Sequence, residues 1–323
     1  MFSAGGPISV VSTRLAPEIE LHVPLVIGRE AAVFIDSGVA RLGPELAAHA
    51  AARGVGPAAS PGGGVVLRAV VHTHSHHDHI GSNGQILRAF PGCRVLGPGL
   101  YASWHEDFER HLLEFARSEP QLVPDTPELR DEVLGLLDEP VRLHGSLSEG
   151  DLLDLGGGVV LEAISVPGHM LAELAYLERS TGTLLLGDAI TGLDWPIIHS
   201  HLSVPDYRAT LSKLERLLGS GRVSGVQAAH FGALSVDETA ALCGRARLYI
   251  SELEQAVLAR VAQAAALGDV WASVCDDLGK VREFRALNTV RAHLSDLEAR
   301  RMVGRLRNGR WQRVGQEAGD DES

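Results

Sequence analysis

The chain has 323 residues, a formal net charge of −12 and 45% hydrophobic residues. This length allows a sizeable buried core and exceeds the roughly 100 to 200 residues usual for one domain, so we expect a main domain with an appendage. The acidic balance argues against a chain that coats nucleic acid or anionic membrane with its whole surface, and it leaves a local basic patch open.

The amino-terminal segment lacks a basic start followed by an apolar run and a cleavage site, and no stretch reaches the roughly 18 apolar residues needed to span a bilayer. Three widely spaced cysteines, Cys93, Cys243 and Cys275, favour reduced core thiols over a disulfide framework. These features predict a soluble, cytoplasmic protein without a membrane partner.

Short apolar runs rich in Val, Ile and Leu recur through the first two thirds of the chain, and Gly, Pro and Asp bound them. Such runs predict buried strands. They cover residues 8–12, 22–27, 31–36, 67–72, 159–165, 173–178 and 183–188. Residues 41–53 and 205–218 instead carry apolar residues at helical spacing. The mixture predicts an α/β domain in which helices cover sheets.

Two regions interrupt this pattern. The sequence of residues 100–138 predicts two helices joined by a Pro-containing turn and inserted between strands. This insertion could serve as a lid over a site or as part of the scaffold, and both interpretations stay open. From about residue 240 helices dominate, and the sequence LRNGRW then carries the Asn-Gly signal of a tight hairpin. Helix, helix and hairpin in this order predict a winged-helix-like module.

The segment HTHSHHDHIGS, residues 72–82, directly follows a predicted strand. In an extended segment alternate side chains share a face, so His74 and His76 point the same way, while Asp78 and His79 fall on the first turn of the next helix. Two imidazoles can bind one ion, and a carboxylate with an imidazole can bind a second. These donors favour zinc or a similar divalent metal over calcium.

Three further polar residues follow buried strands downstream. His169 lies at a turn after 159–165, Asp188 ends the run at 183–188, and His230 follows another apolar strand. Sites in α/β sheets commonly gather at the carboxyl ends of strands. As a set, these residues predict the remaining ligands of a dinuclear centre.

This combination resembles the metallo-β-lactamase superfamily over about residues 8–235. The family has an Asp-x-Gly turn, HxHxDH, a Gly-His turn, a Gly-Asp strand end and a final histidine, and the matching segments here are IDSG, HSHHDH, PGH, GD and AH. The resemblance implies a four-layer αβ/βα sandwich. Ala229 departs from the pattern, because many relatives have glycine before the last histidine.

The resemblance also implies two zinc ions per chain, with iron or manganese as alternatives. It assigns the ligands to two sets: His74, His76 and His169 for one ion, and Asp78, His79 and His230 for the other. Asp188 would bridge the two ions, and Asp36 would hold the ligand loop from behind. His72 ends the strand and His77 fills the variable position, so neither is expected to be a ligand.

Two divalent metals about 3.5 to 4 Å apart can share a water and lower its pKa from about 15.7 towards neutrality. Asp78 and Asp188 would then position the metal-bound hydroxide for attack on a carbonyl or phosphorus centre, while a metal stabilises the oxyanion. The segment between Asp188 and His230 is too short for the large inserted domain of RNA-processing relatives. Hydrolysis of an ester, thioester or lactone is therefore favoured, and smaller nucleases stay open.

The candidate substrate pocket comes from two segments. The loop after Asp188 and the helical insertion at 100–138 supply six candidate residues: Tyr101, Trp104, His105, Trp195, His199 and His201. A loop that leaves a metal ligand commonly shapes the pocket. Aromatic side chains from the insertion would add an apolar wall for an acyl chain.

The carboxyl-terminal module resembles the winged-helix tail of one branch of the superfamily, which includes thioester hydrolases of carrier-bound or CoA-linked acyl chains and an endoribonuclease that prefers single strands. It holds a group of arginines: Arg285, Arg291, Arg300, Arg301, Arg305, Arg307, Arg310 and Arg313. They could contact phosphate groups. In so acidic a chain we favour a module that packs on the main domain.

The sequence thus predicts a dinuclear zinc hydrolase of a small acyl substrate, CoA- or carrier-linked, with nucleic acid less favoured as a partner. The alternatives are a metal-dependent endoribonuclease or phosphodiesterase, and a noncatalytic binding protein on the same fold. The predicted organisation is a catalytic domain at 1–238, a winged-helix-like module at 239–315 and a disordered acidic tail at 316–323. The acyl group, the native metal and assembly into a homo-oligomer stay open.

Overall fold

The computed structural model describes residues 6–58, 64–190 and 193–315. Its first sheet has the strand order β1 (Ile8–Ala16), β2 (Ile19–Ile27), β3 (Ala31–Ile35), β5 (Val65–Val71), β6 (Arg94–Gly97) and β7 (Gly145–Ser146), and β4 (Val55–Gly56) pairs with β5. The first three strands are antiparallel, and those from β3 to β7 run parallel. Every residue of β3 is buried, as expected for a strand covered on both faces.

The second sheet has the order β13 (Gly232–Leu234), β12 (Gly225–Ala228), β11 (Thr183–Leu186), β10 (Leu174–Glu178), β9 (Val160–Ser165) and β8 (Leu152–Asp154). Its strands β11 and β12 are parallel, and its other pairs are antiparallel. Helix α7 (Val204–Leu218) connects the two parallel strands. Such a crossover is required because parallel strands cannot be joined by a tight turn.

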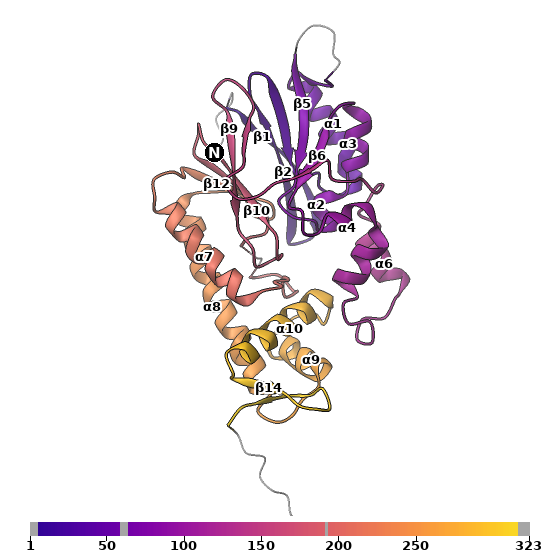
Figure 1. Ribbon diagram of the computed structural model, residues 1–323, viewed down its shortest axis with the longest axis vertical. Helices are drawn as coiled ribbons and strands as arrows, with labels where there is room; N and C mark the ends of the chain where they lie inside the picture. The colour runs from indigo at the N-terminus through magenta and orange to yellow at the C-terminus, as the bar shows by residue number, and fades with distance from the viewer. Residues whose placement is uncertain (1–5, 59–63, 191–192, 316–323) are drawn as a thin grey trace, which may run out of the picture.

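Four layers result, as Figure 1 shows. One core lies between the sheets and includes Val33 and Tyr176. A second lies between the first sheet and the helices α1 (Gly43–Ala52) and α3 (Asn83–Ala89), and a third lies between the second sheet and the helices α7 and α8 (Val236–Arg260). The predicted four-layer αβ/βα sandwich is confirmed.

Most predicted elements are present with small shifts at their ends. The seven predicted strands correspond to β1, β2, β3, β5, β9, β10 and β11, and the two predicted helices to α1 and α7. Strand β6 was not predicted, because it has only four residues and begins with the exposed Arg94. The short elements η1 (Ala40–Leu42) and α2 (His77–Ile80) flank the site.

The insertion between β6 and β7 is helical, as predicted. It contains α4 (Ala102–Glu106), α5 (Phe108–His111), a short π-helix η2 (Leu112–Ala116) and α6 (Pro127–Leu134). Thr126 caps α6 by accepting a hydrogen bond from the backbone N–H of Leu129, and Pro127 occupies the first turn. In Figure 1 this insertion lies beside the lower edge of the first sheet.

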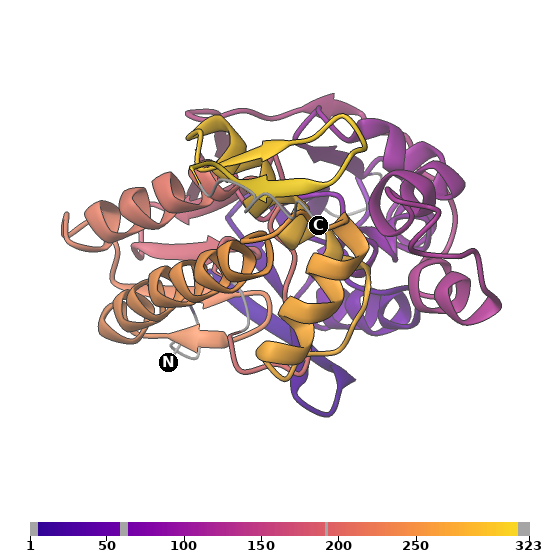
Figure 2. The same cartoon turned by 90° about the horizontal axis from the view of Figure 1, so that it is seen from below.

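The last part of the chain contains α9 (Leu267–Asp277), α10 (Phe284–Ala299) and the hairpin β14 (Val303–Arg305) with β15 (Trp311–Arg313). The predicted hairpin is present, and Gly309 supplies the positive φ of 79° in its turn. Figure 2, seen from below, places the hairpin and α10 across the end of the sandwich. These elements share a core that includes Val257, Leu294 and Trp311.

Helix α8 crosses the predicted division at residues 238 and 239 without a break. A capping box of Ser235 and Glu238 begins the helix. Its first half contributes Cys243 to the core of the second sheet, and its second half contributes Val257 to the core of the last elements. The division into 1–238 and 239–315 stays a prediction, and the predicted disordered tail at 316–323 lies outside the described residues.

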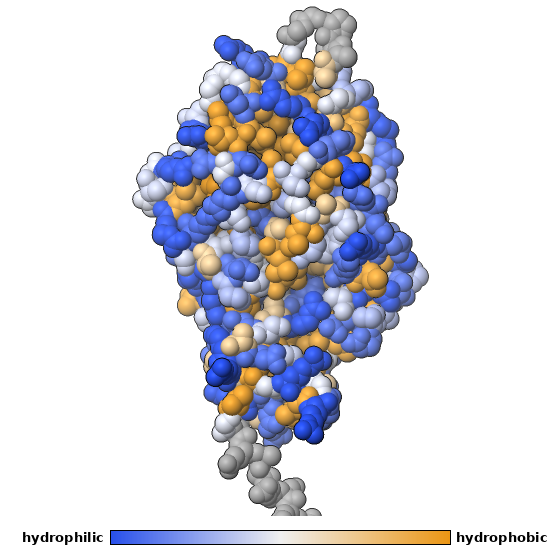
Figure 3. Space-filling model, in the orientation of Figure 1, coloured by the Kyte–Doolittle hydropathy of each residue, from blue (hydrophilic) through white to orange (hydrophobic). Residues whose placement is uncertain are grey.

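Within the described ranges, no helix is both long enough and apolar enough to cross a membrane. Figure 3 shows a face on which hydrophilic residues surround several apolar patches. Large apolar side chains that are exposed include Leu100, Leu171 and Leu248. Exposed apolar residues of this kind are common on folded proteins.

Candidate metal centre

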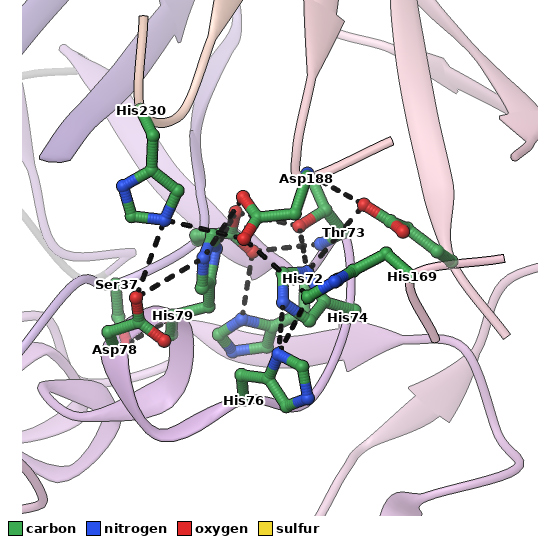
Figure 4. A network of polar contacts seen from close by, with 12 residues as sticks. Ser37, His72, Thr73, His74, His76, Asp78, His79, His169, Asp188 and His230 are labelled. Carbon is green, nitrogen blue, oxygen red and sulfur yellow. Dashed lines mark hydrogen bonds and ion pairs between the residues drawn. The ribbon is translucent and has the colours of Figure 1, made fainter. Parts of the chain in front are cut away.

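The candidate ligands meet at one edge of the two sheets, as Figure 4 shows. The loop with His74, His76, Asp78 and His79 follows β5 of the first sheet, while His169, Asp188 and His230 follow β9, β11 and β12 of the second. The sandwich therefore brings together ligands that lie far apart in the chain. Local spacing explains the first four, and sheet packing explains the others.

Three imidazoles form the first set. Nδ1 of His76 lies 3.1 Å from Nε2 of His74 and 2.9 Å from Nε2 of His169. One ligand atom from each residue lies within 4.8 Å of the others. All three side chains are buried, so water competes little for these nitrogens.

The second set contains one carboxylate and two imidazoles. Oδ2 of Asp78 lies 3.4 Å from Nε2 of His230 and 3.8 Å from Nε2 of His79. These atoms also lie within 4.8 Å of one another. The structure thus places all six predicted ligands of the two sets as two adjacent groups.

Asp188 lies between the two sets. Its Oδ1 is 3.5 Å from Nε2 of His79, and its Oδ2 is 3.6 Å from Nε2 of His169 and 3.3 Å from Nε2 of His230. The backbone N–H of Asp188 donates to Glu173 Oε1 at 2.7 Å. Asp188 thus has an oxygen near a histidine of each set, which is the placement expected of a residue that could bind both ions.

Asp36 lies behind the ligand loop. It accepts hydrogen bonds from the backbone N–H and the hydroxyl of Thr73, both at 2.8 Å, and from Nδ1 of His79 at 2.9 Å. Its φ of 63° lies in the left-handed region, which aspartate tolerates better than most residues. Asp36 therefore orients a candidate ligand without being part of either set.

Oxygen atoms also anchor the outer nitrogens of three other rings. Nδ1 of His230 donates to Glu20 O at 2.7 Å, Nδ1 of His169 donates to Ser200 O, and Nδ1 of His74 lies 3.0 Å from the Thr73 hydroxyl. Metal-binding histidines typically donate their outer N–H in this way, which leaves the inner nitrogen as an acceptor. Ordinary core packing does not require this repeated arrangement.

The inner atoms of the cluster lack ordinary partners. Nε2 of His79 and Oδ1 of Asp188 are buried and have no hydrogen-bond partner among the described residues. With the outer nitrogens of His74 and His169 donating to oxygen, two imidazole lone pairs converge on His76. Buried polar atoms without a partner are costly, and a divalent cation would satisfy these atoms once His79 is neutral. The residues therefore fit a metal pair.

The electrostatics of the two sets differ. Burial opposes the charged form of His79, but the carboxylates of Asp188, Asp78 and Asp36 outweigh it and raise its pKa to about 9. Burial lowers the pKa of His169 to about 3. Burial disfavours the charged form of Asp188, yet His230 and His79 hold its pKa well below its usual value. The carboxylates thus attract positive charge to the second set.

Trp195 and His199 border this centre. Nε2 of His199 lies 3.3 Å from Oδ2 of Asp188, and its ring stacks on His169 with centroids 4.5 Å apart. The Trp195 ring meets His230 edge to face at 5.4 Å. Both residues border the centre, and their part in a substrate pocket stays a prediction.

His105 and His201 occupy different places from the predicted pocket. His201 is buried with its Nε2 3.2 Å from Nε2 of His293, and it stacks on Tyr207. His105 is buried behind the ligand loop, 3.0 Å from the Ser75 hydroxyl. Alternate residues of an extended segment would share a face, so the loop cannot run fully extended between them: His199 faces Asp188, whereas His201 faces His293.

A cavity of about 210 Å³ lies between the insertion and α10. Its lining includes the candidate pocket residues Tyr101 and Trp104 together with Phe115 and Leu171, and α10 contributes Asn288, Arg291, Ala292 and Ser295. The Phe115 ring stacks on His76 with centroids 4.1 Å apart. The inner wall of the cavity therefore touches a candidate ligand. Sequence reasoning missed Phe115 and the α10 wall, because no local pattern marks them.

The sandwich and the paired His/Asp clusters at its strand ends define a class of metal-binding α/β proteins. Residues 23–222 match the family model described as the metallo-beta-lactamase superfamily. That segment is more than half of the chain, so the chain belongs to the metallo-β-lactamase superfamily. The resemblance inferred from the sequence is confirmed.

Curated relatives match a limited segment. A hydroxyacylglutathione hydrolase from Vibrio campbellii (strain ATCC BAA-1116) is 28% identical over 126 residues, which are 39% of this chain and 34% of that protein. An uncharacterized protein, YobT, from Bacillus subtilis (strain 168) is 30% identical over 128 residues, which are 39% of this chain and 47% of that protein. The match thus spans less than half the length of these relatives.

Solved structures share the fold over nearly the whole chain. A metallo-beta-lactamase family protein from Thermus thermophilus has a TM-score of 0.73 at 19% identity, covering 95% of this chain and 98% of that chain. A beta-lactamase domain protein from Burkholderia ambifaria has a TM-score of 0.69 at 15% identity, covering 97% and 93%. The shared fold therefore includes the carboxyl-terminal helices.

Proposed function

We propose that this protein is a metal-dependent hydrolase that uses two divalent ions, with zinc as the expected metal, to cleave a thioester or related ester of a small acyl substrate. The observation that carries the proposal is the convergence of seven donor residues in two adjacent sets with Asp188 between them. A noncatalytic binding protein would have no physical need for the complete set.

The donor residues would hold the metals in two groups, with His74, His76 and His169 in one and Asp78, His79 and His230 in the other. When bound, such ions supply Lewis acidity that acidifies water and polarises a substrate carbonyl. Asp36 and Thr73 fix the orientation of the ligand loop. Asp78 and Asp188 supply the negative charge around which both sets assemble.

The surroundings of the centre favour a small acyl substrate. The adjacent cavity has an aromatic and aliphatic wall on the side of the insertion and a largely polar wall on α10, and its volume of about 210 Å³ suits a short chain rather than a polymer. The relatives named as hydroxyacylglutathione hydrolases support a thioester in particular. Their match covers about a third of their length, so the leaving group, whether CoA, a carrier or another thiol, stays part of the proposal.

The position of α10 argues against nucleic acid as the main substrate. In a winged-helix module the last helix before the wing commonly enters the DNA groove, whereas here α10 packs on the insertion and buries residues such as Asn288 and His293. Arg285, Arg291 and Arg300 form ion pairs with acidic residues of the chain. We therefore propose that residues 239–315 have the order of elements of a winged-helix module but pack on the main domain instead of binding nucleic acid.

One observation keeps the endoribonuclease reading as the second candidate. Arginines of the hairpin region are exposed and have no ion pair within the described part of the chain: Arg305, Arg307, Arg310 and Arg313. They could contact phosphate groups of single-stranded RNA. The acidic body of the protein opposes a wider nucleic-acid surface.

Metal analysis followed by parallel assays tests the proposal. We expect two metal ions per chain and hydrolysis of hydroxyacylglutathione or acyl-CoA thioesters, with activity lost in His79→Ala. A lactone and single-stranded RNA serve as the comparison substrates. RNA cleavage that exceeds thioester hydrolysis and disappears in an Arg307→Ala, Arg310→Ala double variant would establish the second candidate instead. A protein that holds no more than one metal and keeps full activity in His79→Ala would contradict the dinuclear centre.

A further inference from the structure

Two buried histidines outside both ligand sets, His72 and His105, are joined through Asn83. Nε2 of His72 lies 2.9 Å from the side-chain amide of Asn83, and the other end of that amide lies 3.5 Å from Nδ1 of His105. All three side chains are almost completely buried. An amide has a donor end and an acceptor end, so it can satisfy one ring nitrogen on each side.

Both ends of this chain of contacts reach the ligand loop. At one end, Nδ1 of His72 donates to Oδ1 of Asp36 at 3.3 Å, and Asp36 also accepts from Nδ1 of His79. At the other end, Nε2 of His105 lies 3.0 Å from the hydroxyl of Ser75. Ser75 stands between two candidate ligands in the sequence. The insertion therefore contacts the loop both directly and through Asp36.

The chain of contacts is held in a packed environment. The rings of His72 and His105 lie 5.0 Å apart, and the Tyr176 hydroxyl donates to His72 O at 2.7 Å. A Cβ added at Gly97 would lie 3.0 Å from the His72 Cβ, so the neighbouring strand leaves no spare space. Close packing transmits displacements rather than absorbing them.

A second buried histidine of the insertion gives a natural comparison. His111 is fully buried, yet neither of its ring nitrogens has a hydrogen-bond partner in the described ranges. Its ring stacks on Trp104 with centroids 4.6 Å apart. His111 thus contributes to the packing of the insertion, whereas His105 contributes a polar connection to the ligand loop.

We propose that His72, Asn83 and His105 are positioning residues that couple the seating of the insertion to the orientation of Asp36, and through Asp36 to metal binding by His79. The inference rests on the proposed metal centre. Coupling between two sites is reciprocal. Metal binding must therefore stabilise the packing of the insertion on the ligand loop. Breaking the contacts between His72, Asn83 and His105 must in turn lower the affinity for the metal.

The test uses the full chain and readouts other than activity. Zinc affinity is measured by competition with a chromophoric chelator, the ligand field is followed by the absorption of bound Co²⁺, and hydrogen exchange of residues 100–138 is measured with and without zinc. The variants are Asn83→Ala and His105→Phe, with His105→Gln as the conservative replacement. His111→Phe is the matched control, because it changes a buried histidine of the insertion outside the chain of contacts.

In the wild type we expect two zinc ions and slower exchange in 100–138 when zinc is bound. Asn83→Ala and His105→Phe should lower the zinc affinity of the set that contains His79 by about 10- to 100-fold. This is the usual effect of removing a residue that hydrogen-bonds to a metal ligand. They should also change the Co²⁺ spectrum and abolish the protection by zinc. His105→Gln should recover part of the affinity, and His111→Phe should retain it.

Three results are distinguishable from these. Wild-type affinity and protection in both Asn83→Ala and His105→Phe would overturn the coupling. An equal loss in His111→Phe would assign the effect to packing of the insertion instead and would also overturn it. A wild type that binds no metal would contradict the proposed function itself. Thermal unfolding of the metal-free variants checks folding, and if His105→Phe does not fold, Asn83→Ala and His105→Gln decide the question.

Discussion

In the metal-free protein the histidines of the two ligand sets differ in protonation. This difference predicts how strongly the metal affinity of each set depends on pH. Carboxylates outweigh burial at His79 and raise its pKa to about 9, whereas burial lowers the pKa of His169 to about 3. At pH 7 these values make the His79 ring of the metal-free protein positively charged and the His169 ring neutral. Because metal binds neutral imidazole, the proton on His79 must leave when the ion arrives.

The size of this competition follows from the gap between pKa and pH. Two pH units below its pKa, His79 is neutral in about 1% of molecules, which costs about 3 kcal/mol and lowers the apparent affinity about 100-fold. The carboxylates of Asp188 and Asp78 likewise outweigh burial at His230 and raise its pKa, which adds a second proton. Affinity at this set should therefore rise at least about tenfold per pH unit up to pH 9. Affinity of the set with His74, His76 and His169 should change little between pH 6 and 9.

Competition titrations at several pH values between 6 and 9, corrected for protonation of the chelator, measure both affinities. Calorimetry in buffers of different ionisation enthalpy counts the protons released with each ion. The variant Asp36→Asn removes one carboxylate that raises the pKa of His79, so its pH-dependent range should move to lower pH. Two ions with the same pH-independent affinity, or no proton released at pH 7, would refute this reasoning.

Substitutions at Asp36, Gly168 and Phe115 give further expected outcomes. Asp36→Asn should weaken the ion of the His79 set by about 10- to 100-fold in chelator competition while the protein still folds, because asparagine also tolerates the positive φ of 63°. Gly168→Ala should lower the free energy of unfolding by about 1 to 3 kcal/mol in denaturant titrations, because φ is 141° there and the new Cβ would lie 2.5 Å from Tyr207 Cα; an unchanged midpoint would contradict this. Phe115→Ala should cost about 3 to 5 kcal/mol, as expected for a buried ring, whereas the half-exposed Leu113→Ala should cost far less in the same measurement.

Local spacing explains why much of the centre could be predicted. The HxHxDH segment places four donors on one strand-to-helix corner, and the ends of β9, β11 and β12 supply the others. Each of these positions follows from an apolar strand and the polar residue after it. The placement of Asp36 follows from the same logic, because it ends β3 beside β5.

Residues that depend on packing between distant segments could not be predicted in this way. Phe115 lies against His76 only because the insertion folds back over the ligand loop. His72 was predicted to be a mere strand end, but the structure gives both of its ring nitrogens partners. His199 and His201 were predicted together, but the course of the loop, with only Ser200 between them, directs their rings to different environments. The spacing of apolar and polar residues along the sequence does not reveal any of these contacts.

The position of α10 shows that the last part of the chain belongs physically to the site. Asn288 donates to Phe115 O at 3.0 Å, and Phe115 stacks on the candidate ligand His76. Thr289 donates to His199 O at 3.3 Å and accepts from the backbone N–H of His201 at 3.1 Å. One helix turn thus contacts both the insertion and the loop after Asp188, the two segments whose residues Phe115 and His199 lie against candidate ligands. Because neither segment is part of a sheet, their positions depend on α10, and the carboxyl-terminal elements shape the pocket even though they supply no ligand to either set.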